Sequence, residues 1–280
     1  MDLWLRRSAR VIGTILGAFA GLVALQLIRL RRTTFLSHGF VLDHIVGPDT
    51  VPGAPPTPLR MIVFGDSTTT GVGVERPDEA LPVQLARELG RRRARRVHVT
   101  SYGWPGARVA DLVREQVPRA SQPWRTGEES PVLPTADIVV VVAGSNDATN
   151  RTPPRQYRTA VREALEMIRE AAPHAEVVLA GIPIFRGALL HVEPLIWLTD
   201  QYARVLRPIS RGEAARAGAS FADLAGRLPG RHPPEAFASD RFHPSAAGYA
   251  AWAQVIADAL DARPDLAPGP AASDLQVAGA

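Results

Sequence analysis

Beyond residue 58 the chain alternates between short apolar runs and amphipathic stretches. Five β-branched runs are predicted as strands, and they lie at residues 60–66, 96–102, 136–144, 175–183 and 219–225. Between them, apolar residues at three- and four-residue spacing predict helices at 79–92, 108–117 and 154–172. The continuous run DIVVVVAG (137–144) is too apolar for a half-exposed strand and fits a parallel strand covered on both faces. The pattern predicts a doubly wound α/β domain with a central parallel sheet, in which ligands bind at the carboxyl ends of the strands.

Residues suited to nucleophilic catalysis follow these predicted strands. The first strand ends at Ser67, the second is followed by Gly106, and the third ends in a turn that contains Asn146. A loop after the last strand contains Asp240 and His243 and leads into a helix. The positions share one edge of the predicted sheet, so we expect the five residues to meet there.

Each residue type supplies a part that ester chemistry needs. A serine hydroxyl such as that of Ser67 is a weak nucleophile until a base removes its proton, and His243 is a suitable base. Asp240, three residues upstream, can fix the histidine tautomer and stabilise the imidazolium. The backbone N–H groups of Ser67 and Gly106 and the side-chain amide of Asn146 are candidate oxyanion donors, each worth roughly 2.7–4 kcal/mol.

Structural roles explain some of the same residues. Gly-Asp-Ser is turn chemistry, so Ser67 alone would be read as a turn residue, and the distant positions are what favour the nucleophile. Asp66 is predicted to cap the turn after the first strand, and Asp147 to hold the loop after Asn146. The other histidines lack a comparable setting and are read as ordinary; they are His38, His44, His98, His174, His191 and His232.

The amino-terminal residues 11–28 carry no charge, and 18 residues are about the shortest stretch that crosses a hydrocarbon core as a helix. Arginines flank both ends in equal number, so they do not fix the orientation, and we expect the body of the chain to lie outside a cell membrane. A cleaved signal peptide is the alternative, because Ala18-Phe19-Ala20 resembles a cleavage site. The apolar run continues past that point and ends in RLRR, which favours an uncleaved single-pass anchor.

Three glycines recur every four residues within this stretch, at Gly13, Gly17 and Gly21. The spacing allows two membrane helices to approach closely and predicts a weak dimer. Glycine is also common in membrane helices without any pairing, and that explanation is the simpler one.

Charge and composition narrow the chemistry further. Six arginines against one aspartate give the first 32 residues a charge of +5, so the rest carries −1 of the total +4 and lacks the electrostatic footprint of a nucleic-acid-binding protein. No lysine occurs, which excludes Schiff-base chemistry and a P-loop lysine. No cysteine occurs, which excludes a thiolate nucleophile and disulfides.

The four polar blocks together resemble the SGNH/GDSL hydrolase family. FGDST (64–68) is similar to its first block, Gly106 in WPGARVADL to its second, GSND (144–147) to its third and SDRFHPSAAGY (239–249) to its fifth, in family order across residues 61 to about 260. The resemblance implies a flavodoxin-like three-layer α/β/α fold and a serine esterase or lipase that needs no metal or cofactor. It also implies Ser67, Asp240 and His243 as the catalytic residues and Ser67, Gly106 and Asn146 as the oxyanion hole. Thr68 stands where the family often has leucine, which puts substrate preference in doubt rather than catalysis.

The expected substrates are small acyl esters, lipids or acylated glycans. An acyltransferase or deacetylase acting on envelope glycan or lipid and a non-catalytic envelope protein are the alternatives. The apolar stretch 183–198, with Phe185, Leu189, Leu190, Ile196 and Trp197, is either the buried face of a helix or an acyl-chain pocket. The predicted boundaries are an anchor at 1–32, a proline-rich linker at 33–60, the hydrolase domain at 61–262 and a disordered tail at 263–280.

Overall fold

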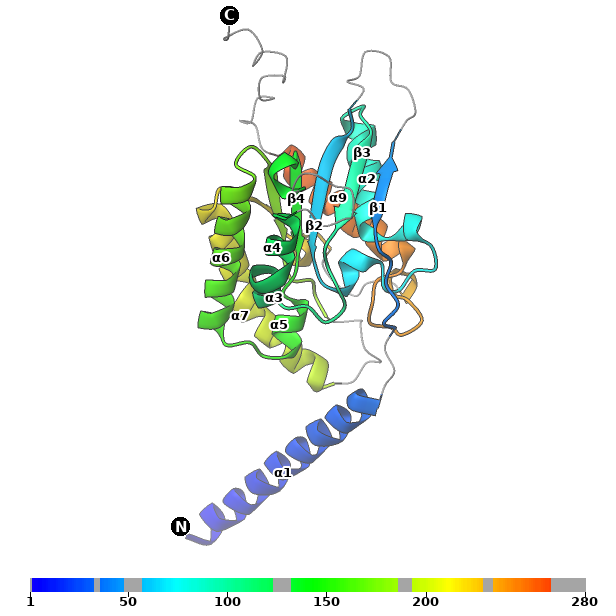
Figure 1. The fold of residues 1–280 in the computed structure, drawn as a ribbon. Coiled ribbons are helices and arrows are strands. Elements are labelled where there is room, and N and C mark those ends of the chain that lie inside the picture. Colours follow the sequence, from blue (N-terminus) through cyan, green and yellow to red (C-terminus); the bar gives the residue numbers. More distant parts are fainter. Residues whose placement is uncertain are drawn as a thin grey trace, which may run out of the picture.

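The computed structural model describes residues 2–32, 36–47, 57–122, 132–185, 193–228 and 234–262. Within these ranges, helices cover both faces of one sheet, and the long helix α1 (Asp2–Arg32) projects away from them (Figure 1). The predicted three-layer α/β/α fold is therefore confirmed.

The sheet has the strand order β1-β3-β2-β4-β5-β6. Its strands are β1 (Asp43–Val46), β2 (Leu59–Gly65), β3 (Val97–Ser101), β4 (Ile138–Val142), β5 (Glu176–Ala180) and β6 (Ser220–Ala222). Four of the five predicted runs contain one of these strands, the run 60–66 overlaps β2 from its second residue on, and all five strands pair in parallel. β1 is the exception, because it pairs with β3 in the antiparallel sense and makes the sheet mixed at that edge.

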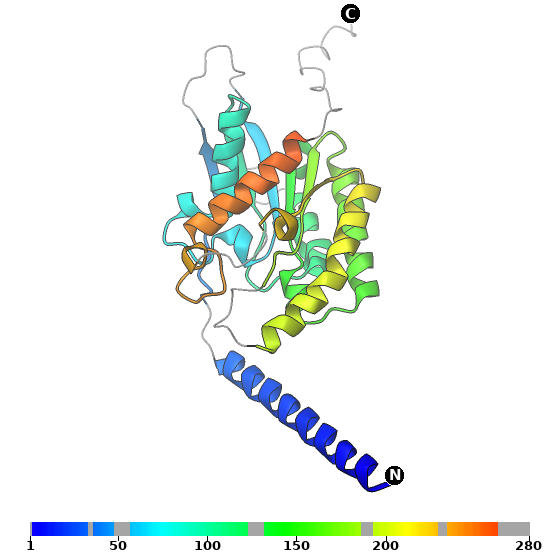
Figure 2. The same ribbon diagram turned by 180° about the vertical axis from the view of Figure 1, so that it is seen from behind.

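The helices divide between the two faces of the sheet. α2 (Leu81–Arg92) and α9 (Ala246–Asp261) cover one face, which Figure 2 shows from the front. The other face is covered by α3 (Val109–Asp111), a π-helical turn (Leu112–Gln116), α4 (Val117–Ala120), α6 (Pro154–Ala171) and α7 (Leu195–Arg216). The short helices α5 (Ser145–Thr149) and α8 (Leu224–Arg227) follow β4 and β6.

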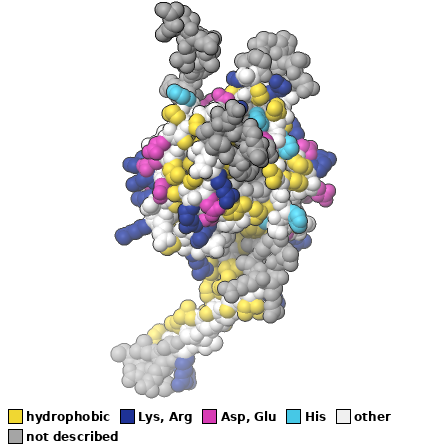
Figure 3. All heavy atoms as spheres, in the orientation of Figure 1, with side chains coloured by type: hydrophobic (Ala, Val, Ile, Leu, Met, Phe, Trp, Pro, Cys, Tyr) yellow, Lys and Arg dark blue, Asp and Glu magenta, His cyan; other side chains and the backbone are white. Residues whose placement is uncertain are grey.

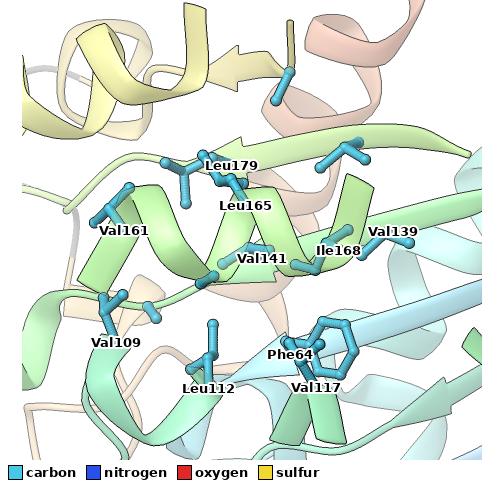
Figure 4. Packing of buried hydrophobic residues seen from close by; sticks show 14 of the residues in the cluster. Phe64, Val109, Leu112, Val117, Val139, Val141, Val161, Leu165, Ile168 and Leu179 are labelled. Atoms are coloured by element: carbon cyan, nitrogen blue, oxygen red, sulfur yellow. The ribbon is translucent and has the colours of Figure 1, made fainter. Parts of the chain in front are cut away.

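Alternation along the strands divides the core into two layers. In β2, Met61 and Val63 belong to the cluster under α2 and α9, whereas Ile62 and Phe64 belong to the cluster on the opposite face. All four are at most 1% exposed. Figure 4 shows the second cluster, in which residues of α6 spaced three or four apart lie over β4 and β5. A fully buried apolar side chain contributes about 1.5–3 kcal/mol, so this continuous burial is what holds the strand ends in place.

Helix α1 has the length and composition of a membrane span. The stretch Arg10–Arg29 contains 20 residues, and only 6% of them are buried. Figure 3 shows apolar side chains exposed along it. Signal sequences have the same length and composition, so membrane anchoring by α1 remains a prediction. Gly13, Gly17 and Gly21 have open space around them, and the weak dimer remains a prediction.

The stretch assigned to a linker, residues 33–60, contains part of the sheet. β1 lies within it, and β2 begins at Leu59. β1 escaped prediction because it has four residues and pairs through its backbone at an exposed edge, with Ile45 55% exposed. The predicted tail at 263–280 lies outside the described residues, and the domain boundaries stay predictions.

Candidate active site

Ser67 lies at the carboxyl end of β2, in the first position of a 3-10 turn (Ser67–Thr70). Asp66 caps this turn, as its place in the sequence predicted: its Oδ1 accepts hydrogen bonds from the Thr68 backbone N–H at 3.0 Å and from the Thr68 hydroxyl at 2.8 Å. Gln116 holds the strand end from the other side, because its amide accepts from the Gly65 N–H at 2.9 Å and donates to the Gly65 carbonyl at 2.8 Å. These contacts fix the Ser67 backbone, and Ser67 is 8% exposed.

Ser67, His243 and Asp240 form one hydrogen-bonded chain. The distance from Ser67 Oγ to His243 Nε2 is 3.0 Å, and that from His243 Nδ1 to Asp240 Oδ2 is 2.6 Å. An ionised carboxylate only accepts hydrogen bonds, so Nδ1 carries the proton and Nε2 is left to accept from the serine hydroxyl. The structure thus brings together three residues separated by up to 176 positions in the sequence.

The Asp240 carboxylate is held in its charged form. Burial by itself raises the pKa of this carboxyl, but hydrogen bonds from the His243 ring and from the backbone N–H groups of Phe242 and His243 outweigh it and lower the pKa to about 2. Both backbone N–H groups donate to Oδ1 at 3.0 Å. Oδ2 is thereby directed to the imidazole, the orientation that stabilises an imidazolium.

The loop after β3 lies directly against the turn that carries Ser67. A Cβ on Gly103 would come within 1.9 Å of Thr69 Oγ1, so only glycine permits this approach. Gly106, further along the loop, has a φ of +84°, which favours glycine. It precedes α3 by three residues.

Asn146 lies beside the same loop. Its Nδ2 donates to the carbonyl of Ala107, the residue after Gly106, at 2.9 Å. An amide nitrogen carries two hydrogens, so one remains to face the pocket that Asn146 lines together with Ser67. Among the described residues, the backbone N–H groups of Ser67 and Gly106 have no hydrogen-bond partner in the protein. Their role as oxyanion donors remains a proposal.

Two buried carboxylates lie close to the site without joining the hydrogen-bonded chain. Asp147 Oδ2 accepts from the Val109 N–H at 2.9 Å and so ties the Asn146 turn to α3. Burial raises the pKa of both Asp66 and Asp147 from their ordinary values, although hydrogen bonds to each work in the opposite direction. Both therefore have structural partners, as expected from the sequence.

An apolar pocket of about 240 Å³ opens beside Ser67. Its walls come from the segment after β5, the loop that carries His243, and α9. The large apolar side chains that line it are Ile184, Phe185, Leu228, Phe237, Phe242 and Trp252. The arrangement places a hydrogen-bonded serine at the mouth of an apolar cavity.

The apolar stretch 183–198 is interpreted from the sequence as either an acyl-chain pocket or the buried face of a helix, and its residues serve both. Phe185 is 4% exposed and lines the pocket. Ile196 is buried on α7, and Trp197 is 43% exposed and points away from the core. Leu189 and Leu190 lie outside the described residues.

Several supporting residues were not found from the sequence. The Tyr249 hydroxyl donates to the Val72 carbonyl at 2.5 Å, which joins α9 to the chain after Ser67. A Cβ on Gly73 would meet the Pro244 carbonyl at 2.5 Å, so this glycine packs closely against the His243 loop. A polar residue at a core-facing helical position was the available signal for Gln116, which is fully buried. Within the described ranges, no group of three or more His, Cys, Asp or Glu side chains is arranged to bind a metal.

Comparison with known proteins gives consistent matches. Residues 63–251 match the GDSL-like lipase/acylhydrolase family. A GDSL-like esterase of Mycobacterium tuberculosis is 28% identical over 218 residues, which cover 73% of this chain and 62% of that protein. The chain thus spans less than two thirds of this curated relative.

Solved structures share the fold. A lipase from a goat rumen metagenome superimposes with a TM-score of 0.58 at 19% identity, covering 72% of this chain and 97% of its own. An extracellular lipase of Streptomyces rimosus gives 0.52 at 18% identity, covering 72% and 99%. A proposed SGNH hydrolase of Slackia heliotrinireducens gives 0.52 at 25% identity, covering 73% and 100%. The architecture is that of the SGNH hydrolases.

Proposed function

Because the chain belongs to the GDSL-like lipase/acylhydrolase family, we propose that it is a membrane-anchored serine hydrolase that cleaves carboxylic acyl esters through an acyl-serine intermediate. The observation that supports this most directly is the hydrogen-bonded chain from Ser67 through His243 to Asp240 at the mouth of an apolar pocket. A serine that serves only a turn has no need of an oriented imidazole at 3.0 Å.

In the first half of the reaction, Ser67 Oγ attacks the carbonyl carbon of the ester while His243 Nε2 takes its proton. The carbonyl oxygen becomes an oxyanion, which the N–H groups of Ser67 and Gly106 and the Asn146 amide would stabilise. The C–O bond to the alcohol then breaks, and the alcohol leaves with the proton from His243. Asp240 keeps its charge throughout and stabilises the imidazolium.

In the second half, water attacks the acyl-serine carbonyl and gives a proton to His243. Collapse of this second tetrahedral intermediate breaks the bond to Ser67 Oγ, which recovers its proton from the imidazolium. The products are the free acid and the regenerated enzyme, so the balance requires no cofactor.

The pocket supports a preference for short acyl groups. Its volume of about 240 Å³ lies below the roughly 300–1,000 Å³ typical of sites for drug-sized ligands. Apolar walls favour the acyl chain over the alcohol. We therefore assign a short acyl group to this pocket and expect glycans or lipids that carry short acyl esters as substrates.

The placement of α1 supports action at a membrane surface. The carboxyl ends of the parallel strands, where Ser67 lies, face the side of the domain on which α1 ends (Figure 1). A membrane crossed by Arg10–Arg29 would lie on that side. Substrates carried in the bilayer surface would be within reach of the pocket.

The test uses the full chain in detergent micelles with p-nitrophenyl acetate, butyrate and octanoate. We expect burst release of p-nitrophenol, labelling by a fluorophosphonate probe, and loss of both in Ser67→Ala. Ser121→Ala is the matched control, since among the described residues the Ser121 hydroxyl bonds only to the Val117 carbonyl in its own helical turn. Full activity in Ser67→Ala would refute the proposal.

A further inference from the structure

The Asp240 carboxylate receives a hydrogen bond from a part of the chain that the catalytic motifs do not include. The backbone N–H of Leu36 donates to Asp240 Oδ2 at 3.2 Å across 204 positions in the sequence. The same oxygen accepts from His243 Nδ1 at 2.6 Å. Leu36 therefore contacts the oxygen on which the histidine depends.

The segment that contains Leu36, residues 36–42, lies against the turn that carries the nucleophile. The Phe40 N–H donates to the Thr70 carbonyl at 2.7 Å, and the Thr70 hydroxyl donates to the Ser67 carbonyl at 2.9 Å. A Cβ on Gly39 would come within 2.4 Å of Thr70 Oγ1, so glycine is required for this close packing. The segment and the nucleophilic turn are packed as one unit.

The segment is also fixed downstream. Leu42 is 1% exposed, and its carbonyl accepts from the Ser101 N–H at 2.9 Å. β1 follows immediately and pairs with β3 over four residues. The position of Leu36 is therefore tied to the sheet.

The end of α1 is fixed by a separate contact. Gln26 is 7% exposed although it lies in an otherwise exposed helix. Its Nε2 donates to the Glu193 carbonyl at 2.6 Å, and its Oε1 accepts from the Leu195 N–H at 3.3 Å. The apolar helix is thereby attached to the start of α7, whose Asp200 accepts from the N–H of the pocket residue Phe185 at 3.4 Å.

We propose that the Leu36 backbone N–H is a positioning donor of the catalytic centre, which fixes Asp240 Oδ2 toward His243 and couples the chain after the membrane helix to ester hydrolysis. The assignment rests on the function proposed above. It identifies a positioning group that comes from a backbone amide and so has no counterpart among the sequence motifs. Asp240 then has a donor on each side: two N–H groups on Oδ1, and Leu36 beside the imidazole on Oδ2.

Loss of the Leu36 donor leaves Oδ2 with His243 as its one partner among the described residues, so the carboxylate and the imidazole hold their alignment less tightly. A misaligned base slows proton transfer from Ser67 but removes no contact to the substrate, so kcat should fall while KM changes little.

The experiment compares full-length variants in micelles with p-nitrophenyl butyrate. Leu36→Pro removes the N–H, and replacement of Leu36 by its α-hydroxy acid removes it while keeping the side chain. Leu36→Ala keeps the N–H. Ile45→Thr, on the exposed edge of β1, is the matched control for a substitution in the same region. Thermal unfolding of each variant reports whether the fold is kept.

We expect kcat to fall about tenfold in both variants that lack the N–H, with KM little changed. Leu36→Ala, which keeps the N–H, should retain a higher kcat than either of them, and Ile45→Thr should keep the wild-type activity. If Leu36→Pro fails to fold, the α-hydroxy variant decides. Wild-type kcat in a folded variant without the N–H would overturn the assignment, whereas an inactive wild-type protein would instead overturn the proposed function.

Discussion

Replacement of Asp240 by asparagine changes the charge of the site while keeping its shape. From the part of the chain that the structure describes, the carboxylate accepts four hydrogen bonds, two on each oxygen: from Phe242 N–H and His243 N–H on Oδ1, and from Leu36 N–H and His243 Nδ1 on Oδ2. An asparagine amide offers one oxygen and one NH₂ group. One of the two pairs of hydrogen-bond donors must therefore face the NH₂ group, which is itself a donor and cannot accept from them.

The orientation of the asparagine amide that costs least forces His243 into the tautomer that cannot act as a base toward Ser67. The two donors on Oδ1 are backbone groups that cannot be reversed. Of the two described donors on Oδ2, only the Leu36 N–H is of that kind, because the imidazole can move its proton. We expect the asparagine oxygen at the Oδ1 position and its NH₂ facing Nδ1. The ring proton then moves to Nε2, where it points at Ser67 Oγ and prevents His243 from accepting the serine proton.

The expected loss is about 10⁴-fold in kcat, the size found when an aspartate that orients a catalytic histidine becomes asparagine in a serine protease. At 1.36 kcal/mol for each tenfold, this corresponds to about 5.4 kcal/mol. The assay is p-nitrophenyl acetate hydrolysis, with Ser67→Ala as the floor and Asp78→Asn, an exposed aspartate, as the control. A folded Asp240→Asn protein that keeps more than about a tenth of wild-type kcat would refute the tautomer argument.

Four further results are expected. Asn146→Ala should lower kcat by roughly 10²–10³ with less effect on KM, and steady-state kinetics checks this. Gln116→Met should lower the free energy of unfolding by about 1–3 kcal/mol for each Gly65 backbone group left unpaired, as measured by urea denaturation. Trp252→Ala should shift the preferred ester toward longer acyl chains and cost about 3–5 kcal/mol of stability, as shown by a chain-length series and by melting. Since the pKa of Asp240 is lowered from 3.8 to about 2, its ionised form stabilises the fold fully above pH 3.8 and loses this effect as the pH falls through about 2; the melting difference between wild type and Asp240→Asn should shrink over that interval.

The strands could be predicted from the sequence because burial dictates their composition. β4 is completely buried, and a strand covered on both faces must be apolar throughout, so IVVVV is readable without any structure. β1 is different, since an antiparallel edge strand of four residues gains its place through backbone hydrogen bonds that almost any side chains permit. Its sequence, DHIV, carries no comparable signal.

The residues of the candidate site divide in the same way. Ser67, His243 and Asp240 could be predicted because nucleophile, base and orienting acid each require a particular side chain. A glutamine can take many structural roles, so the residue type of Gln116 does not indicate its role. Its two contacts with Gly65 show that it holds the end of β2. The Leu36 donor is a backbone amide, so its residue type carries no information about the contact.

The amino terminus is interpreted either as an uncleaved anchor or as a cleaved signal peptide. The two interpretations differ in whether the chain stays in the bilayer, but both keep the same contacts to the catalytic centre. Cleavage after Ala20 would release the chain from the bilayer, whereas an uncleaved α1 would hold it there. Gln26 and Leu36 lie downstream of that site, so both would remain attached to the domain in either case. Gln26 contacts the start of α7 from within α1. Leu36 contacts Asp240 from the segment that follows α1. On these contacts, residues 36–42 of the stretch assigned to a linker pack against the turn that carries Ser67 and against Asp240.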